Sequence, residues 1–75
     1  MALSTTHTLD GVEVVPGLLV WDYDLRARRV VRIAYTDHGN PWWELEDPVT
    51  EERGSDMDAS RMWVYHPSNG RKVRV

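Results

Sequence analysis

The chain has 75 residues and a formal net charge of -3, a length that fits one small domain with a thin core. It contains no Cys, which excludes a disulfide scaffold and any thiolate metal site. The longest apolar stretch, residues 18–21, is too short to span a bilayer. The first ten residues lack a signal-peptide pattern, so we expect a cytoplasmic protein with no membrane contact.

The beginning of the chain is Thr-rich and carries no hydrophobic pattern. We therefore expect a flexible N-terminal tail over residues 1–10 and a single domain over residues 11–75. Helical periodicity is poor throughout, whereas β-branched and aromatic residues come in short bursts separated by turn residues, which indicates strands. Residues 11–15 predict a short extended segment, and residues 18–22 predict the first main strand.

A turn is predicted after the first strand, over residues 23–28. The side chains of Asp22 and Asp24 can fold it by accepting hydrogen bonds from backbone N–H groups two residues further on. The second strand is predicted over residues 29–36. It ends at the sequence DHGNP, the densest run of turn-forming residues in the chain.

The third strand is predicted over residues 42–47 and is stopped by Pro48. The next stretch, PVTEERGSDMDAS, has little apolar content, so we expect a long polar loop with Met57 as an apolar anchor inside it. Seven carboxylates lie between residues 44 and 58, opposed by one Arg. This stretch is therefore the acidic part of the chain.

The last two strands are predicted over residues 61–66 and 71–75, joined as a hairpin by the sequence PSNG. Two registers fit this hairpin. A two-residue Asn-Gly turn places His66 opposite Val73, whereas a four-residue loop places His66 opposite Arg71. Both registers turn the same side chains inward, namely Met62, Val64, Val73 and Val75.

Five short strands without a helix predict an all-β fold, specifically a small five-stranded barrel made from a strongly bent antiparallel sheet. Neighbouring side chains on a strand point to opposite faces, so the adjacent tryptophans of the third strand must separate. Trp43 shares a face with Leu45 and is expected in the core. Trp42 shares the outer face with Glu44 and Glu46.

Alternation divides the second strand as well. One face carries Val31, Ile33 and Tyr35, and the other carries Val30, Arg32 and Ala34. The first set is expected to point inward, so Arg32 is expected to point outward. The first strand leaves two alternatives open, because Leu18 and Val20 compete for the interior with Leu19, Trp21 and Tyr23.

The outer set combines aromatic and Arg side chains, the composition of interaction hot spots. Residues 26–32 and 71–74 form two basic stretches in an otherwise acidic chain. The alternatives are that outer indoles cover the edges of a thin core and that the basic stretches are solvated strand faces. The residues predicted to bind a protein or a nucleic acid are Trp42, Trp63, Tyr65, Arg26, Arg28, Arg32 and Arg74.

The sequence has no catalytic or metal-binding pattern. None of His7, His38 and His66 is spaced with a carboxylate or a second His as a metal pair would be. These histidines are expected to be solvated or to stabilise turns. No Ser lies in a G-x-S-x-G context, and the acidic stretch lacks the alternation of a calcium loop. We expect no enzymatic activity, no cofactor and no metal.

The order of the segments G-L-L-V-W-D, V-V-R-I, D-H-G-N-P-W-W-E-L and S-R-M-W-V-Y-H-P resembles the five-strand plan of SH3-like small barrels, which include KOW and Tudor-type modules. It is also similar to short uncharacterised proteins of actinobacteria and their phages. The resemblance covers residues 11–75 as a pattern, and the glycine that KOW motifs place between the first two strands is missing. It implies a binding module that holds peptides, nucleic acid or another protein.

Three functions are compatible with these features. The first is a protein-interaction module, a small regulatory or phage-encoded factor that docks through Trp42, Trp63 and Tyr65 while arginines fix the charge register. The second is nucleic-acid binding, in which the strip of residues 26–32 tracks phosphates and the outer aromatics stack on bases. The third is mimicry of nucleic acid by the acidic stretch. A homodimer through the outer indoles is also open.

Overall fold

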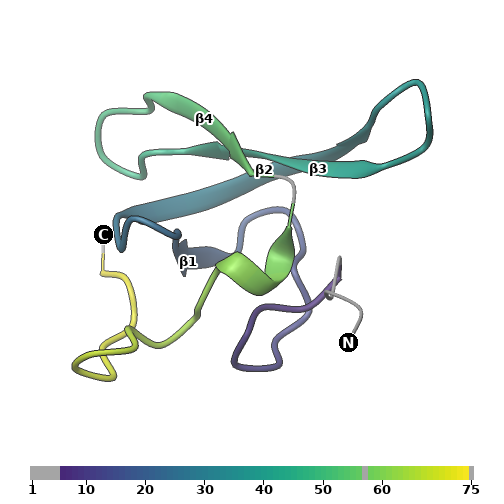
Figure 1. Ribbon diagram of the computed structural model, residues 1–75. Helices are drawn as coiled ribbons and strands as arrows, with labels where there is room; N and C mark the ends of the chain where they lie inside the picture. The colour runs from purple at the N-terminus through teal and green to yellow at the C-terminus, as the bar shows by residue number, and fades with distance from the viewer. Residues whose placement is uncertain (1–5, 57, 75) are drawn as a thin grey trace.

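The computed structural model describes residues 6–56 and 58–74 (Figure 1), so the predicted anchor Met57 and the inward Val75 lie outside the described residues. The four strands form one open antiparallel sheet in the order β1-β2-β3-β4. The predicted all-β class is confirmed, whereas the sheet has four strands and not five. In chain order the elements are β1 (Leu19–Trp21), β2 (Ala27–Tyr35), β3 (Pro41–Glu46), β4 (Arg53–Asp56) and the 3-10 helix η1 (Ala59–Arg61).

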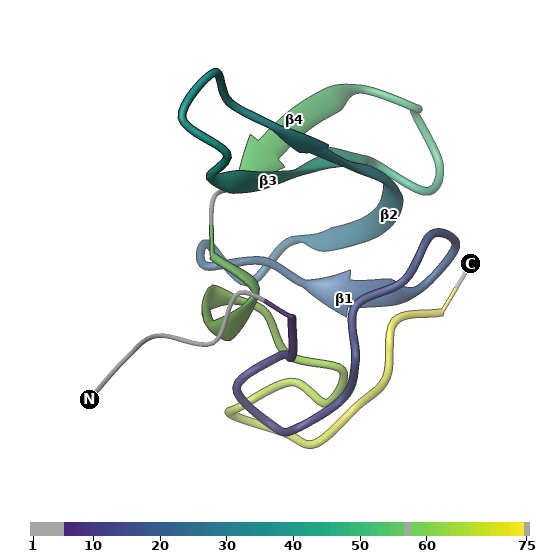
Figure 2. The same cartoon turned by 90° about the vertical axis from the view of Figure 1, so that its right-hand side faces the viewer.

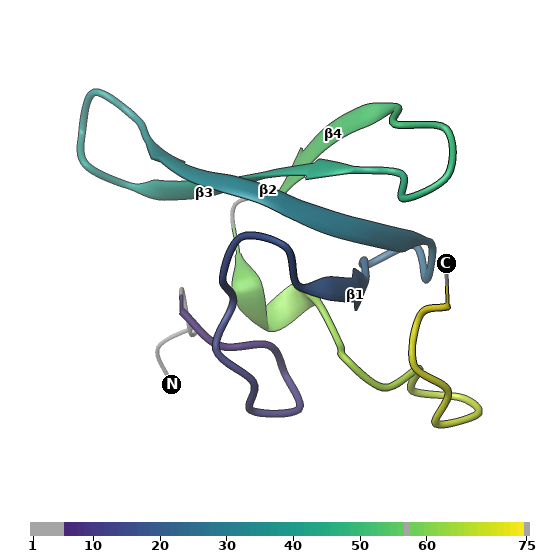
Figure 3. The same cartoon turned by 180° about the vertical axis from the view of Figure 1, so that it is seen from behind.

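The molecule has two layers. The strands β2, β3 and β4 form one of them. The other consists of η1, the two terminal segments and β1, which stays hydrogen-bonded to β2, and it lies on one side of these three strands (Figures 1 and 3). The apolar side chains between the layers remove their surface from water, which is the main favourable contribution to folding. These core residues are Val20, Val30, Trp43, Leu45, Ala59 and Met62.

The adjacent tryptophans divide as strand alternation predicts. Trp43 is 1% exposed, whereas Trp42 lies half-buried on the opposite face of β3. Val30 corrects the prediction for the second strand, because it is buried in the core and not on the outer face. An irregularity between Val30 and Arg32 inserts an extra residue into β2. Such a bulge resets the alternation, so both Val30 and Trp43 point inward and Arg32 still points outward.

Two residues predicted to be buried are exposed because the β2–β3 hairpin projects beyond the layer that covers the sheet (Figure 1). Ile33 is 38% exposed and Tyr35 is 62% exposed. Both lie on the part of β2 nearest the hairpin tip, where no second layer is available to bury them. Alternation assigns a side chain to a face of a strand, but it does not predict how far the covering layer extends.

The predicted long loop contains a strand and a helical turn. β4 pairs antiparallel with β3, for example Leu45 with Gly54, at the edge of the sheet. Its sequence, RGSD, has no apolar residue, and its first three residues are exposed. An edge strand of this kind needs no inward apolar side chain, so hydrophobic alternation could not reveal it. η1 follows, and Asp58 caps it by accepting a 2.9 Å hydrogen bond from the Ser60 N–H.

The two last predicted strands, 61–66 and 71–75, are wrong as continuous strands. The segment after η1 makes one bridge, Trp63 to Trp21, and the hairpin makes one more, Tyr65 to Lys72. The reason is that the backbone N–H groups of this segment have a partner other than a neighbouring strand. The Val64 and Tyr65 N–H groups donate to the carboxylate of Asp10 at 2.9 to 3.1 Å, so a side chain takes the place of a neighbouring strand.

The hairpin itself uses the four-residue loop, one of the two predicted registers. The His66 N–H donates to the Arg71 carbonyl at 2.8 Å, and the Gly70 N–H donates to the His66 carbonyl at 2.7 Å. Gly70 has a φ of 69°, in the left-handed region that favours glycine. The inward side chains Met62, Val64 and Val73 are buried, as predicted.

The β1–β2 and β2–β3 turns have the same geometry but different sequences. In the first, the Leu25 N–H donates to the Asp22 carbonyl at 2.9 Å; in the second, the Gly39 N–H donates to the Thr36 carbonyl at 2.9 Å. Both third residues are left-handed, with φ of 61° for Leu25 and 79° for Gly39. This is the three-residue hairpin loop that normally takes a glycine at that position, so the turn forms even though the glycine expected between the first two strands is missing.

Part of the predicted tail belongs to the folded body. The Leu9 N–H donates to the Met62 carbonyl at 2.9 Å, and Thr8 is buried. Figure 2 shows this segment running beside the last part of the chain. Burial raises the pKa of Asp10, but hydrogen bonds from the Thr8 hydroxyl and from the Tyr65 and Val64 N–H groups outweigh burial and hold the pKa below its ordinary value.

Candidate functional site

The outer face of the sheet carries arginines that are matched to carboxylates on the next strand. Register places Arg29 opposite Glu46 and Arg32 opposite Glu44. The Arg29 guanidinium lies 3.0 Å from Glu46, and Arg32 Nε lies 2.6 Å from Glu44. Arg53 on β4 reaches the other Glu44 oxygen at 2.9 Å. The predicted basic strip is therefore largely neutralised where it crosses the sheet.

Trp42 is covered by one of these arginines. The Arg32 guanidinium carbon lies 5.7 Å from the centre of the indole ring, within the range of a cation–π contact. The same guanidinium is bonded to Glu44. Trp42 is thus part of a packed cross-strand cluster with Arg32 and Glu44, and most of its surface is already covered within the chain.

The other end of the basic strip is occupied as well. Arg28 Nε donates to Asp22 at 3.0 Å, and both side chains are more than four-fifths buried. Arg28 therefore holds the β1–β2 turn closed. Arg26 is exposed on the same turn, and its backbone N–H donates to the Asp22 carboxylate at 2.9 Å. Its guanidinium has no carboxylate within ion-pair distance among the described residues.

The remaining predicted residues lie on the segment after η1 and on the last hairpin. Trp63 is half-buried, and its backbone N–H and carbonyl both bond to Trp21, at 3.0 and 2.7 Å. Tyr65 is 48% exposed, and Lys72 extends over its ring at 5.2 Å. Arg74 is exposed nearby. The seven predicted residues therefore occupy separate regions and do not form one surface.

A groove with a cavity volume of about 480 Å³ lies beside the last hairpin. It brings together two aromatic rings and three cations. Arg71, Lys72 and Arg74 make no ion pair with any residue that the structure describes. We call this region the C-terminal groove; the residues that line it are Trp21, His66, Asn69, Arg71, Lys72 and Arg74.

Internal hydrogen bonds occupy the side-chain acceptors of the C-terminal groove. Asn69 Oδ1 accepts from the Arg71 N–H at 2.9 Å, and His66 Nδ1 accepts from the Ser68 N–H at 3.1 Å. The Trp21 Nε1–H is also used, because it donates to the Arg71 carbonyl at 2.8 Å. The side-chain polar groups left for a ligand are donors: the three cations, the Asn69 amide N–H groups and the second ring nitrogen of His66.

Five of the six lining residues were not among the predicted binding residues. Arg71 and Lys72 were noted only as part of the basic stretch 71–74, and three others were missed altogether. Trp21 was left open because both alternations of the first strand were possible, and its side chain packs edge-on against His66 with ring centres 4.9 Å apart. His66 was expected to stabilise a turn, and its bond to Ser68 does so. Asn69 was treated only as a turn residue. The basic stretch 71–74 was the signal that could have directed attention to all three.

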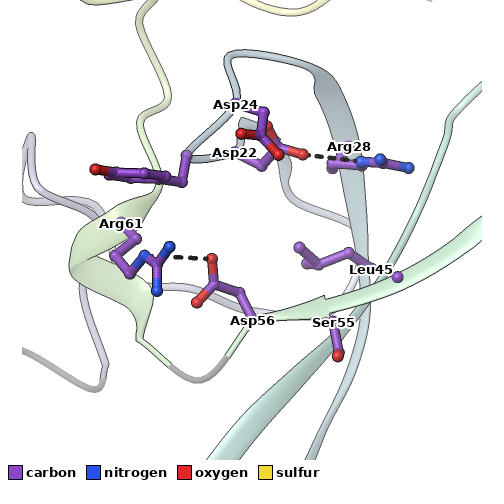
Figure 4. A pocket seen from close by; sticks show the side chains of 9 residues that line it. Asp22, Asp24, Arg28, Leu45, Ser55, Asp56 and Arg61 are labelled. Carbon is purple, nitrogen blue, oxygen red and sulfur yellow. Dashed lines mark hydrogen bonds and ion pairs between the residues drawn. The ribbon is translucent and has the colours of Figure 1, made fainter.

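A second hollow, of about 250 Å³, lies between the β1–β2 turn and β4 (Figure 4). Asp22, Asp24 and Asp56 line it, but two of these carboxylates have cationic partners. Asp22 is bonded to Arg28, and Arg61 lies 3.9 Å from Asp56. The Arg61 guanidinium also covers Tyr23 at 4.4 Å. Most of the charged groups that line this hollow are therefore paired within the chain.

Residues 6–56 and 58–74 contain no group of three or more His, Asp or Glu side chains arranged to hold a metal ion. Within that same part of the chain, no helix has the length and hydropathy needed to cross a membrane.

Comparison with known proteins gives no relative: no protein-family model, no curated protein and no solved structure matches the chain.

Proposed function

We propose that the chain is a small non-enzymatic binding module that holds an acidic segment of a protein partner in the C-terminal groove. The observation that carries this proposal is the contrast in pairing. Arg71, Lys72 and Arg74 surround a groove without a carboxylate partner, whereas the arginines of the sheet face are bonded to Glu44 and Glu46. Unpaired cations attract an anionic partner and orient it on approach.

We further propose that the fold is a five-stranded SH3-like barrel with a very short last strand. The Trp21–Trp63 bridge supports this, because its two hydrogen bonds of 2.7 and 3.0 Å return the chain after η1 to the free edge of β1. Four antiparallel strands followed by a return to the first strand agree with the five-strand plan of such a barrel. In this arrangement the C-terminal groove begins where the return strand meets β1.

Binding of nucleic acid is the second candidate, favoured by the presence of Trp21 and His66 beside the three cations, since aromatic rings stack on bases. Two features weigh against it. The sheet arginines that would continue a phosphate track are already neutralised, and the net charge is -3. Mimicry of nucleic acid is weakened in the same way, because Glu44, Glu46 and Asp56 are bonded to arginines within the chain.

The test is an NMR titration at low salt, in which the amide shifts of isotopically labelled protein are measured. The protein is titrated with a Glu-rich peptide and, separately, with mixed-sequence single-stranded DNA. Peptide-induced shifts should gather on residues 63–74. The variant Arg71→Glu should weaken peptide affinity about tenfold, whereas Arg26→Glu, which changes another unpaired exposed arginine by the same charge, should alter it less than about twofold.

Equal losses in the two variants would mean that only net charge matters and that the groove is not the site. Absence of peptide binding by the wild type would overturn the proposal. If DNA alone binds, with affinity that falls steeply with salt, the nucleic-acid function replaces it.

A further inference from the structure

A third hollow adjoins the C-terminal groove and differs from it in chemistry. It has a volume of about 250 Å³ and is lined by backbone at Gly17 and by aliphatic side chains, with Lys72 as its one charged residue. We call it the aliphatic pocket. Its lining residues are Gly17, Leu18, Leu19, Val64, Lys72 and Val73.

Lys72 lines both hollows, so a ligand that follows the hairpin passes from one to the other. Its ammonium lies over the Tyr65 ring, while the methylene stem of a lysine is itself apolar and can cover an aliphatic neighbour. The Tyr65–Lys72 bridge fixes the backbone at this junction. The two hollows therefore meet at a defined point and present donors on one side and hydrocarbon on the other.

The walls of the aliphatic pocket are held by the backbone of both layers. The Gly17 N–H donates to the Val30 carbonyl at 2.7 Å, and the Val30 N–H donates to the Leu18 carbonyl at 2.9 Å. Val64 and Val73 also line the pocket and are buried. A pocket with walls fixed in this way loses little freedom when an apolar side chain enters it, which favours binding.

We infer that the C-terminal groove and the aliphatic pocket together recognise a protein segment in which an acidic side chain lies within one or two residues of an aliphatic one. This inference rests on the proposed function. A groove whose free polar groups are donors selects carboxylate oxygens, and a neighbouring hydrocarbon pocket selects Leu, Ile or Val. Successive residues of an extended peptide advance by about 3.3 Å, so two hollows that share Lys72 are served by near neighbours in a sequence.

The same geometry favours a peptide over nucleic acid. A sugar–phosphate chain supplies anions, and its bases supply flat rings, but it has no branched aliphatic group to fill a pocket lined by leucine and valine. The Trp21 indole contributes apolar surface beside the donors, because its N–H is already bonded to Arg71. An acidic–aliphatic segment uses all three features of this region.

The experiment compares three capped peptides by NMR titration at low salt: Ser-Glu-Glu-Leu-Ser, the same peptide with serine in place of leucine, and the same peptide with glutamine in place of both glutamates. The leucine peptide should bind about fivefold to tenfold more tightly than the serine peptide, and the glutamine peptide should lose most of the affinity. In the variant Leu19→Gln the preference for leucine should disappear, while binding of the serine peptide stays within about twofold of wild type.

Val15→Gln is the matched control, because it makes the same kind of change at an exposed aliphatic side chain outside both hollows, and the preference should survive. Amide spectra of each variant without peptide show that it is folded. Equal affinity of the leucine and serine peptides would overturn the inference and leave the proposed function standing. Failure of every Glu-containing peptide would overturn both.

Discussion

The outer sheet face and the C-terminal groove are built from the same residue types, but their charges are arranged in opposite ways. Each has arginines beside tryptophan. On the sheet, Glu44 and Glu46 bond the guanidinium groups of all three arginines. In the groove, Arg71 and Arg74 have no carboxylate partner in the described chain. The first region satisfies its charges internally, and the second leaves them for a partner.

The difference arises from what lies across the chain at each position. β2 runs beside β3, which carries two glutamates at the matching positions. The hairpin strand that contains Lys72 runs beside the sequence MWVYH, which has no carboxylate. Composition identifies both regions as aromatic and basic. Only the pairing between strands shows which region bonds its arginines to carboxylates within the chain and which leaves them available to a partner. Four predictions test the comparison.

The largest effect is expected from removing the indole that anchors the groove. Trp21→Ala should lower the free energy of unfolding by about 2 to 3 kcal/mol, since it removes a large half-buried ring, the bond from its Nε1–H to Arg71 and the contact with His66. Trp42→Ala is the counterpart on the sheet. It should cost about 1 kcal/mol, because a partly exposed cation–π contact is weak.

Urea denaturation of the two variants measures both values, and peptide titration separates the two roles. Trp21→Ala should also weaken binding of the Glu-rich peptide, whereas Trp42→Ala should leave affinity within about twofold of wild type. A strong loss of affinity in Trp42→Ala, with the fold intact, would place the site on the sheet face and reverse the comparison.

A smaller effect is expected at Asp10, which holds the segment leading into the groove. Asp10→Asn should cost about 1 to 2 kcal/mol, because hydrogen bonds from Val64 and Tyr65 to a charged acceptor are replaced by weaker ones. The lower end of this range is expected, since the carboxylate is partly exposed. Urea denaturation at neutral pH gives the value, and the sheet amides should be less perturbed than residues 62–66.

The pKa of Asp10 also predicts the pH range of this contribution. Hydrogen bonds from Thr8, Tyr65 and Val64 outweigh the opposing effect of burial and lower the pKa. The native state therefore binds fewer protons than the unfolded chain, so the stabilisation is full above the unfolded value of about 3.9 and is lost as pH falls through the native value. Wild type should lose more stability than Asp10→Asn between pH 5 and 2. Parallel losses would show that Asp10 does not contribute.

Much of the fold follows from hydrophobic alternation, and its failures have specific causes. Alternation correctly buries Trp43 and Leu45 and exposes Arg32. It misplaces Val30, because the bulge adds one residue to β2 and strict alternation of side chains does not predict such an insertion. It misses β4, because an edge strand made of Arg, Gly, Ser and Asp carries no apolar signal.

The candidate site was less predictable than the fold. Residues 71–74 are visibly basic, and strand alternation predicted that Arg74 points outward. Trp21 could not be assigned, because the first strand alternates equally well in either phase. Whether an arginine is free also depends on its neighbours across the sheet, and these follow from register. The pairing of Arg32 with Glu44 therefore became visible only when β2 and β3 were placed side by side.

The last prediction tests whether pairing alone separates the two regions. Glu44→Gln combined with Glu46→Gln should free Arg29, Arg32 and Arg53 on the outer face, at a cost of about 1 kcal/mol in stability, because partly exposed ion pairs contribute little. The Glu-rich peptide should then shift amides of β2 and β3 at low salt, in addition to those of the groove. This new binding should be weaker than groove binding, since the sheet face offers no comparable hollow to surround a side chain.

Glu51→Gln combined with Glu52→Gln is the matched control. It removes two negative charges from the same part of the chain, but these glutamates form no ion pair with a described residue. If the control gains sheet binding equally, long-range charge and not pairing separates the two regions. If neither variant gains it, unpaired arginines alone are insufficient to bind the acidic peptide. The C-terminal groove would then bind it because Trp21 and His66 enclose the site. A gain confined to the first variant would mean that Glu44 and Glu46 are what keeps this basic sheet face closed to acidic partners.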